Sequence, residues 1–327
     1  MSFWNTLPKP FFALAPMADV TDPAYRKIIA EYKAPDVTWT EFVSADGLYH
    51  TREKGVMTDE ENPLVRDLGF SEGEHPIVAQ LFSSKPEMMA YASNLAKERG
   101  FDGVDINMGC PDRSIEKQGS GAAMMKDPET ARAVIQAART SGLPVSVKTR
   151  LGYNAEDIDG WIATLLTERL PALTVHMRTR KEMSKVEAHW DLMPRIVALR
   201  DELSPETLII GNGDVKDLDD ARAKVAAYGC DGIMLGRAIF GAPWLFTGRK
   251  PEEVGPSERL TALRKLAEEF GELRPAKSVH ILKKHVKAFI TGWDGATEFR
   301  SELMNAMTLP DFLAVIEQYA GAVGSAV

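Results

Sequence analysis

The stretch GVDINMG, residues 103–109, decides the fold of this chain, because it is a mostly apolar run that stops at a glycine. Runs that are apolar throughout, rather than alternating, are typical of parallel strands that helices cover on both faces. Cys110 and Pro111 follow at once, so a thiol lies just beyond the end of the predicted strand. Similar short runs begin at Phe11, Val37, Ile77, Val145, Ala172, Leu208 and Gly232, which makes eight.

The segments between these runs show helical periodicity and recognisable ends. In residues 83–100, Ser84 and Glu87 have the spacing of a capping box, and Gly100 stands at the expected stop. Residues 126–142 and 215–229 show the same kind of pattern. Eight strand–helix units predict an α/β fold, a (β/α)8 TIM barrel, with an open doubly wound sheet as the alternative.

The pattern changes near residue 250, which predicts two domains. We expect the barrel to occupy residues 1–247. Residues 256–327 show helical periodicity without a strand-like run, and they predict a C-terminal helical bundle.

Composition narrows the classes of protein that fit. The 327 residues are 44% hydrophobic and carry a net charge of −8, which describes a globular chain and argues against wholesale coating of nucleic acid. The two cysteines, Cys110 and Cys230, form no CxxC pair, so neither a disulfide framework nor a metal site is expected. The chain also lacks a signal pattern and an apolar stretch of the roughly 20 residues that span a membrane. We therefore expect a cytoplasmic monomer without membrane contact.

Polar and charged residues gather where the predicted strands end. In a TIM barrel these carboxyl ends meet at one mouth, where binding and catalytic groups lie. Aliphatic side chains ordinarily fill a barrel interior, so a ring of polar groups there indicates a ligand. The strand-end residues are Pro16 and Met17, Glu41, Gln80, Asn107 and Cys110, Lys148 and Arg150, His176 and Arg178, Gly211–Asp214, and Gly236 and Arg237.

The last two strand ends, GNGD at 211–214 and GR at 236–237, indicate a phosphate site. TIM barrels commonly bind phosphate between the loops after strands seven and eight. Glycine there lets backbone N–H groups approach an anion closely, and an arginine adds positive charge. Either motif alone would be a weak signal, but their joint position favours a phosphate-bearing ligand.

Short motifs follow the predicted barrel in order: APMADVTD (15–22), TEF (40–42), AQLF (79–82), NMGCP (107–111), GSGAAMMKDP (119–128), VKTRLG (147–152), VHMRTR (175–180), GNGD (211–214) and LGRA (235–238). Taken together, these motifs resemble those of the tRNA-dihydrouridine synthases, flavoproteins that reduce specific uridines in tRNA. One departure from the family pattern is Met177, where glycine is common, and we expect its side chain to crowd the backbone near the cofactor.

The resemblance implies FMN at the barrel mouth and NADPH as the electron donor, although the chain carries no nicotinamide fingerprint of its own. Lys148 and His176 would lie beside the pyrimidine edge of the flavin. A fixed ammonium such as that of Lys148 would stabilise the negative charge of reduced flavin in a dry pocket. The resemblance assigns Gln80 and the backbone of Pro16, Met17 and Ala18 to the ring, and Asn212, Gly213, Asp214, Gly236 and Arg237 to the ribityl phosphate.

The resemblance also gives Cys110 a role as proton donor. Reduction of the uracil C5=C6 bond needs a hydride at C6, which flavin N5 can deliver, and a proton at C5. An ordinary thiol, with a pKa of about 8.5, is mostly protonated near neutrality and can donate that proton. Cys230 leads into the last strand, and we expect it to be a buried structural cysteine instead.

The partner that the resemblance implies is tRNA, gripped in part by the C-terminal bundle. Residues 274–287 hold five Lys and Arg residues and no carboxylate. On a helix, Lys277, Lys284 and Lys287 would form a free basic stripe opposite an apolar one. Such side chains could bind RNA phosphates at one local surface, even though the net charge of the whole chain is negative. Other substrate-facing residues are Asn107 and Arg150 in the pocket, and Arg178, Arg180, Lys181 and Lys185 after the sixth strand.

Two other functions stay open at this point. An FMN barrel that reduces a free pyrimidine or another small enone, similar to the dihydroorotate dehydrogenases, would not need the helical tail. A non-catalytic RNA-binding flavoprotein would have no chemical reason to keep both Cys110 and Lys148.

Overall fold

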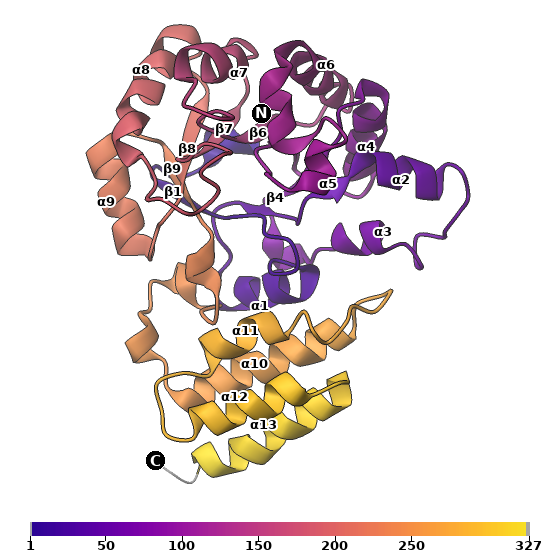
Figure 1. The fold of residues 1–327 in the computed structure, drawn as a ribbon, viewed down its shortest axis with the longest axis vertical. Coiled ribbons are helices and arrows are strands. Elements are labelled where there is room, and N and C mark those ends of the chain that lie inside the picture. Colours follow the sequence, from indigo (N-terminus) through magenta and orange to yellow (C-terminus); the bar gives the residue numbers. More distant parts are fainter. Residues whose placement is uncertain (1, 325–327) are drawn as a thin grey trace.

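Parallel strands form the centre of the molecule in the computed structural model, which describes residues 2–324 (Figure 1). The strands are β1 (Phe11–Leu14), β2 (Thr38–Trp39), β3 (Val43–Ser44), β4 (Ile77–Phe82), β5 (Gly103–Met108), β6 (Val145–Arg150), β7 (Ala172–His176), β8 (Leu208–Asn212) and β9 (Gly232–Leu235). Their order is β1-β9-β8-β7-β6-β5-β4-β2, and β3 also pairs with β4. Pairing of Ala13 in β1 with Val37, just before β2, closes the sheet into a barrel.

The prediction of a TIM barrel is confirmed, because each of the eight predicted runs contains a strand. The run that begins at Val37 differs in detail, since it carries the two short strands β2 and β3. The ladder is interrupted at Thr40, whose hydroxyl oxygen accepts the backbone N–H of Gln80 (N···O 3.0 Å) in place of a main-chain carbonyl.

Helices connect the strands and cover the outside of the barrel (Figure 1). Aspartates begin several of them: the side chain of Asp112 accepts a backbone N–H of the first turn of α5 (Arg113–Glu116), and those of Asp22, Asp127 and Asp217 do the same for three longer helices. These three are α1 (Pro23–Lys33), α6 (Pro128–Arg139) and α9 (Leu218–Tyr228). The others are α2 (Ala45–Arg52), α3 (Pro63–Asp67), α4 (Pro86–Glu98), α7 (Ala163–Thr167) and α8 (Met193–Leu203).

The start of α4 differs from the prediction. Its N-cap is Lys85, without a side-chain cap, and the Ser84 hydroxyl instead donates to the carbonyl oxygen of Gln118 at 2.5 Å. The predicted capping box is therefore wrong, because the Ser84 hydroxyl is bonded to a loop of the next strand–helix unit instead of to its own helix. The predicted stop is confirmed, since Gly100 has a φ of +86° just after the helix.

The barrel interior has an apolar floor and a polar mouth. Trp4, in the N-terminal 3-10 turn Phe3–Thr6, packs against Phe11 at the floor. Nearer the mouth, the buried residues Gln80, Asp105 and Ser146 are neighbours in register on β4, β5 and β6. The predicted ring of polar groups therefore begins inside the barrel, below its rim.

The C-terminal residues form a helical bundle beside α1 (Figure 1). Its helices are α10 (Pro256–Gly271), α11 (Lys283–Phe289), α12 (Ala296–Asn305) and α13 (Leu309–Gly324). Leu263 and Phe289 of the bundle belong to the same apolar cluster as the barrel helices. Residues 274–282 are not an α-helix, so the prediction of one helix through residues 274–287 is wrong over most of that segment. Within residues 2–324, no helix is both long and apolar enough to cross a bilayer.

Gly241 lies where the last barrel turn meets the bundle. Its φ is +65°, and a β-carbon there would lie 2.4 Å from the carbonyl carbon of Ala288 in α11. Backbone conformation and close approach therefore both require glycine at this contact.

We predict that Gly241→Ala lowers the free energy of unfolding by about 2–5 kcal/mol, because left-handed strain and overlap with α11 add together. Chemical denaturation followed by circular dichroism measures the loss. Gly248→Ala is the matched control, since Gly248 has a φ of +84° but nothing within 4 Å of the added carbon. The control should lose about 1–2 kcal/mol, and equal losses in both variants would contradict a steric role for Gly241.

Candidate active site

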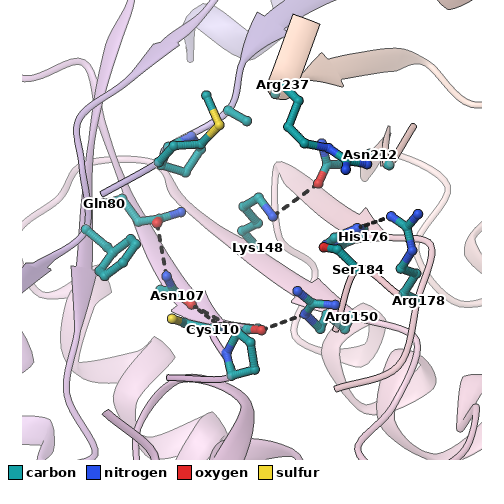
Figure 2. Close-up of a pocket in the computed structure, with 18 of the residues that line it drawn as sticks. Gln80, Asn107, Cys110, Lys148, Arg150, His176, Arg178, Ser184, Asn212 and Arg237 are labelled. Atoms are coloured by element: carbon teal, nitrogen blue, oxygen red, sulfur yellow. Dashed lines mark hydrogen bonds between the residues drawn. The ribbon is translucent and has the colours of Figure 1, made fainter. Parts of the chain in front are cut away.

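One pocket opens at the carboxyl ends of the strands (Figure 2). It encloses about 940 Å³, counting its open entrance, which is in the range of small-molecule and cofactor sites. Ala18 is exposed and lies outside the lining, so its predicted contact is not part of this pocket. The predicted residues that do line it are Pro16, Met17, Gln80, Asn107, Cys110, Lys148, Arg150, His176, Arg178, Asn212, Gly213, Asp214, Gly236 and Arg237.

Some lining residues were not predicted. Phe42 and Ser184 are the most informative, because one adds an aromatic wall and the other a hydroxyl. Phe42 stands within the quoted TEF motif, so an aromatic residue next to a strand end was the signal that could have found it. Ser184 lies in the long loop after β7, where no periodicity marks it. The remaining unpredicted lining residues are Ala15, Gly109, Pro111 and Val215.

Asn107 holds the loop that carries Cys110. Its side-chain oxygen accepts the backbone N–H groups of Gly109 (N···O 3.1 Å) and Cys110 (2.9 Å). Arg150 supports the loop from the other side, since its Nε donates to the Gly109 carbonyl oxygen at 2.9 Å. Burial raises the pKa of the Cys110 thiol above its ordinary value. The loop therefore presents a protonated thiol to the pocket at neutral pH (Figure 2).

Buried cations stand opposite this thiol. Burial lowers the pKa of Lys148 to about 8, and the charge of Arg150 acts in the same direction. The Lys148 ammonium lies 3.4 Å from Oδ1 of Asn212. Burial likewise lowers the pKa of Arg150 to about 10, and this side chain donates to the Met183 carbonyl oxygen at 2.7 Å. Both groups are still cationic at pH 7, so the pocket is complementary to an anion.

His176 is neutral in this setting. Burial lowers its pKa well below the usual value, and the charges of Arg150, Lys148 and Arg178 add to the effect. Arg178 can only donate, so the Nε2 of His176, 3.0 Å from Arg178 Nη1, must be the accepting nitrogen. The proton of the neutral ring is therefore on Nδ1.

Asp214 organises the arginines at the predicted phosphate end. Its carboxylate pairs with Arg178 and with Arg237, the latter at 2.5 Å, and pairing with Arg178 is the main reason that its pKa is lowered. The Arg237 side chain is 65% exposed, which leaves it room for a second anionic partner. Gly213 has a φ of +125°, and a β-carbon there would lie 3.0 Å from that of Ala188. A bare backbone beside an exposed guanidinium fits a phosphate group.

The loop after β7 forms the lip of the pocket. Lys181 and Lys185 are exposed there, and Arg180 pairs with Glu116. Arg178 was predicted to contact tRNA phosphates together with these residues, but its side chain is 3% exposed and faces Asp214. That part of the prediction is wrong, because the first arginine of the VHMRTR motif turns inward.

Met177 does not crowd the pocket. Its side chain is fully buried in the core between the barrel and its helices, and the residue is not part of the pocket lining. Successive residues at the end of a strand point to opposite faces, so His176 takes the pocket side and Met177 the outer side. The expectation of a methionine next to the cofactor is therefore wrong.

Lys277 is buried against the barrel. Its ammonium lies 2.9 Å from Glu41, 3.3 Å from Asp67 and 3.8 Å from Asp22, and its side chain is 3% exposed. Burial alone would lower the pKa of Lys277, but these carboxylates raise it above its ordinary value. The prediction of a free phosphate-binding lysine is therefore wrong here.

The other two lysines of the predicted stripe reach solvent. Lys284 is 44% exposed and pairs with Asp19 at 3.0 Å, next to the pocket residues of the first strand end. Lys287 is exposed on α11. Both side chains are placed where an external phosphate could reach them.

These features define a (β/α)8 protein with a cationic, anion-binding mouth. Comparison with known proteins gives its family. A family model described as "Dihydrouridine synthase (Dus)" matches residues 13–322. A relative from Staphylococcus aureus (strain Mu50), "Probable tRNA-dihydrouridine synthase", is 40% identical over 324 residues, which cover 97% of this chain and 95% of the relative. "Probable tRNA-dihydrouridine synthase 2" from Bacillus subtilis (strain 168) is 41% identical over 326 residues, with 97% and 96% covered. The chain therefore belongs to the dihydrouridine synthase family, a family of oxidoreductases, and the predicted resemblance is confirmed.

Solved structures support the fold alone. Histamine dehydrogenase from Rhizobium sp. 4-9 aligns with a TM-score of 0.53 at 12% identity, over 95% of this chain and 62% of that chain. A variant of NCR from Zymomonas mobilis aligns with a TM-score of 0.50 at 14% identity, over 76% and 90%.

We predict that Lys277→Met lowers the free energy of unfolding by about 3–5 kcal/mol at pH 8, because it leaves buried carboxylates without their cation. Burial raises the pKa of Glu41 and of Asp22. A carboxyl with a raised pKa in the folded state favours folding at low pH, and this contribution is lost as the pH rises through that pKa. The penalty should therefore be smaller at pH 5 than at pH 8.

Denaturation curves of the wild type and of Lys277→Met at pH 5 and pH 8 measure the penalty. Lys287→Met is the control, since an exposed lysine should change stability by less than about 0.5 kcal/mol. A penalty for Lys277→Met that is absent, or the same at both pH values, would contradict the buried ion cluster.

Proposed function

We propose that the protein is a tRNA-dihydrouridine synthase that binds FMN, accepts electrons from NADPH and reduces the C5=C6 bond of uridine in tRNA. The observation that carries the proposal is a protonated thiol, Cys110, that shares one pocket with the buried ammonium of Lys148. Family membership, and the names of relatives that match along 97% of the chain, support tRNA as the substrate and flavin as the cofactor.

The pocket fits FMN at both of its ends. Gly213, Gly236 and Arg237 would hold the phosphate, and Gln80 and Lys148 would face the ring. FMN, when bound, supplies the hydride for the base. Bound FMN would displace water from around the Lys148 ammonium. In such a dry site, a fixed charge stabilises a nearby anion far more than it does in water.

Cys110 supplies the proton. Its raised pKa keeps the thiol protonated through neutral pH, and a neutral acid does not repel the negative charge that grows on the uracil ring. Asn107 and Arg150 hold the backbone of its loop, so the residue that carries the sulfur is kept at a fixed place beside the pocket. The target uridine must leave its stack to reach this thiol, at a cost of a few kcal/mol that contacts in the pocket offset.

Exposed lysines on both sides of the mouth would bind the tRNA backbone. Lys181 and Lys185 lie on the lip, and Lys284 and Lys287 lie on α11. Phosphate contacts of this kind position the RNA without reading its sequence.

We predict that Arg237→Ala weakens FMN binding about 10- to 100-fold, because a charge-assisted contact to the phosphate is lost. Riboflavin, which lacks the phosphate, is the matched control ligand, and its affinity should not change. Titration of the apoprotein followed by flavin fluorescence measures both. An equal loss for the two ligands, or no loss for either, would contradict a phosphate site at Arg237.

We predict that Cys110→Ala retains flavin, reduces it with NADPH at the wild-type rate, and then loses about 10²- to 10⁴-fold in the rate at which tRNA reoxidises it. Rapid mixing separates these half-reactions, since the flavin bleaches with NADPH and recovers with tRNA. Cys230→Ala is the control, because Cys230 is buried in the core, and both of its half-reactions should stay near wild type. Recovery at full speed in Cys110→Ala would remove this thiol from the mechanism.

A further inference from the structure

Asp105 is a buried carboxylate that the proposed chemistry leaves without a role. It lies on β5 with no exposed surface, in register with the pocket residue Gln80, and it is not itself part of the pocket lining. Its Oδ1 accepts the Ser146 hydroxyl at 2.6 Å, and its Oδ2 accepts Nε2 of Gln80 at 2.7 Å. A carboxylate at this depth is costly, so its partners indicate what it does.

A chain of hydrogen bonds leads from Asp105 to Cys110. Gln80 Oε1 accepts from Asn107 Nδ2 at 3.1 Å, and Asn107 Oδ1 accepts the backbone N–H groups of Gly109 and Cys110. Figure 2 shows the upper part of this chain, from Gln80 through Asn107 to Cys110.

The orientation of both amides is fixed by the two ends of the chain. Backbone N–H groups can only donate, so Asn107 must turn its oxygen toward Cys110 and its nitrogen toward Gln80. Gln80 must then meet that nitrogen with its oxygen, which leaves its own nitrogen facing Asp105. The carboxylate of Asp105 is the acceptor that this last N–H group requires.

We propose that Asp105 is a positioning residue that fixes the orientation of the Gln80 and Asn107 amides and, through them, the loop that carries Cys110. The inference rests on the proposed function only in treating Cys110 as the proton donor, since the hydrogen bonds themselves are independent of that role.

The surroundings of Asp105 suit an acceptor. Burial raises its pKa to about 6, while hydrogen bonds from Ser146 and Gln80 and the charge of Lys148 act in the opposite direction. The carboxylate is therefore ionised at neutral pH and accepts at both oxygens. Without it, the Gln80 amide is held only through Asn107. A half-turn of Gln80, which would set its nitrogen against the nitrogen of Asn107, is then opposed from one side only. After such a half-turn, Asn107 would be free to release Gly109 and Cys110.

The test compares Asp105→Ala with Ser146→Ala. Ser146→Ala removes the other partner of Asp105 but leaves its bond to Gln80, so it is the matched control in the same layer. Iodoacetamide labelling at pH 8, followed by peptide mass spectrometry, reports on the Cys110 loop. Cys230, the second cysteine of the chain, is buried, and its labelling in the same sample corrects for global unfolding.

In Asp105→Ala, labelling of Cys110 relative to Cys230 should rise at least about threefold, because the loop opens locally. The kcat of uridine reduction should fall at least about tenfold with KM for tRNA unchanged, because a displaced acid still leaves the binding surface intact. Ser146→Ala should match the wild type in both measurements. Asp105→Asn, which keeps an oxygen for Gln80, should recover most of the loss. If Asp105→Ala does not fold, Asp105→Ser, whose side chain is too short to reach Gln80, replaces it with the same expectations.

A folded Asp105→Ala or Asp105→Ser protein that matches Ser146→Ala in labelling and in kcat would overturn the inference. Failure of the proposed function is a different result, since then the wild-type protein itself forms no dihydrouridine. In that case the labelling comparison still decides the role of Asp105.

Discussion

The burial of positive charge at the mouth of a closed barrel is the constraint on which the rest of the structure depends. Lys148 and Arg150 lie at the end of β6 and His176 at the end of its neighbour β7, so these three groups share one small volume. Two of these groups stay cationic, and the pKa of the third, His176, is lowered mainly by burial and further by the neighbouring charges, so it is neutral. An arrangement of this kind is costly without an anion, and a bound phosphate and a reduced flavin would each supply negative charge.

The C-terminal region is attached to the barrel by the opposite arrangement of charge. Carboxylates of the barrel surround one buried cation of the tail, Lys277, at the end of the second strand. Glu41, its nearest partner, also accepts the backbone N–H of Asp19, just beyond the Met17 residue of the pocket. The contact that docks the tail therefore also holds a loop of the active site. The same contact sets α11 near this loop, where Lys284 pairs with Asp19. In the proposed function, Lys284 and Lys287 would bind the tRNA backbone.

The sequence carried enough information to predict the barrel and most of its pocket, for a physical reason. Strands buried on both faces are apolar throughout, so their ends are visible, and the closed topology brings all of those ends to one place. Gln80, Lys148 and Asn212 could therefore be assigned to one site although they are far apart in the chain. The pocket glycines Gly213 and Gly236, which we propose bind phosphate, were visible for the same reason, because they follow two neighbouring strands.

The features that the sequence did not predict depend on contacts between side chains, which periodicity does not reveal. Lys277 has the spacing of a surface stripe, but carboxylates more than 200 residues earlier in the chain bury it. Ser84 has the spacing of a cap, but the Gln118 carbonyl takes its hydroxyl. Met177 follows a residue of the pocket, yet the alternation of the strand turns it outward. Asp105 lies in mid-strand, where the sequence shows a polar residue without its neighbours, and its role became visible only from the hydrogen bonds of Gln80 and Asn107.

We propose above that this pocket reduces a uridine within tRNA. Nucleoside mass spectrometry of an unmodified tRNA transcript, after incubation with the purified protein, FMN and NADPH, tests it most directly. We expect dihydrouridine in the tRNA digest and no reduction of free uridine under the same conditions. A tRNA that stays unmodified, while a free pyrimidine or a small enone is reduced, would contradict it.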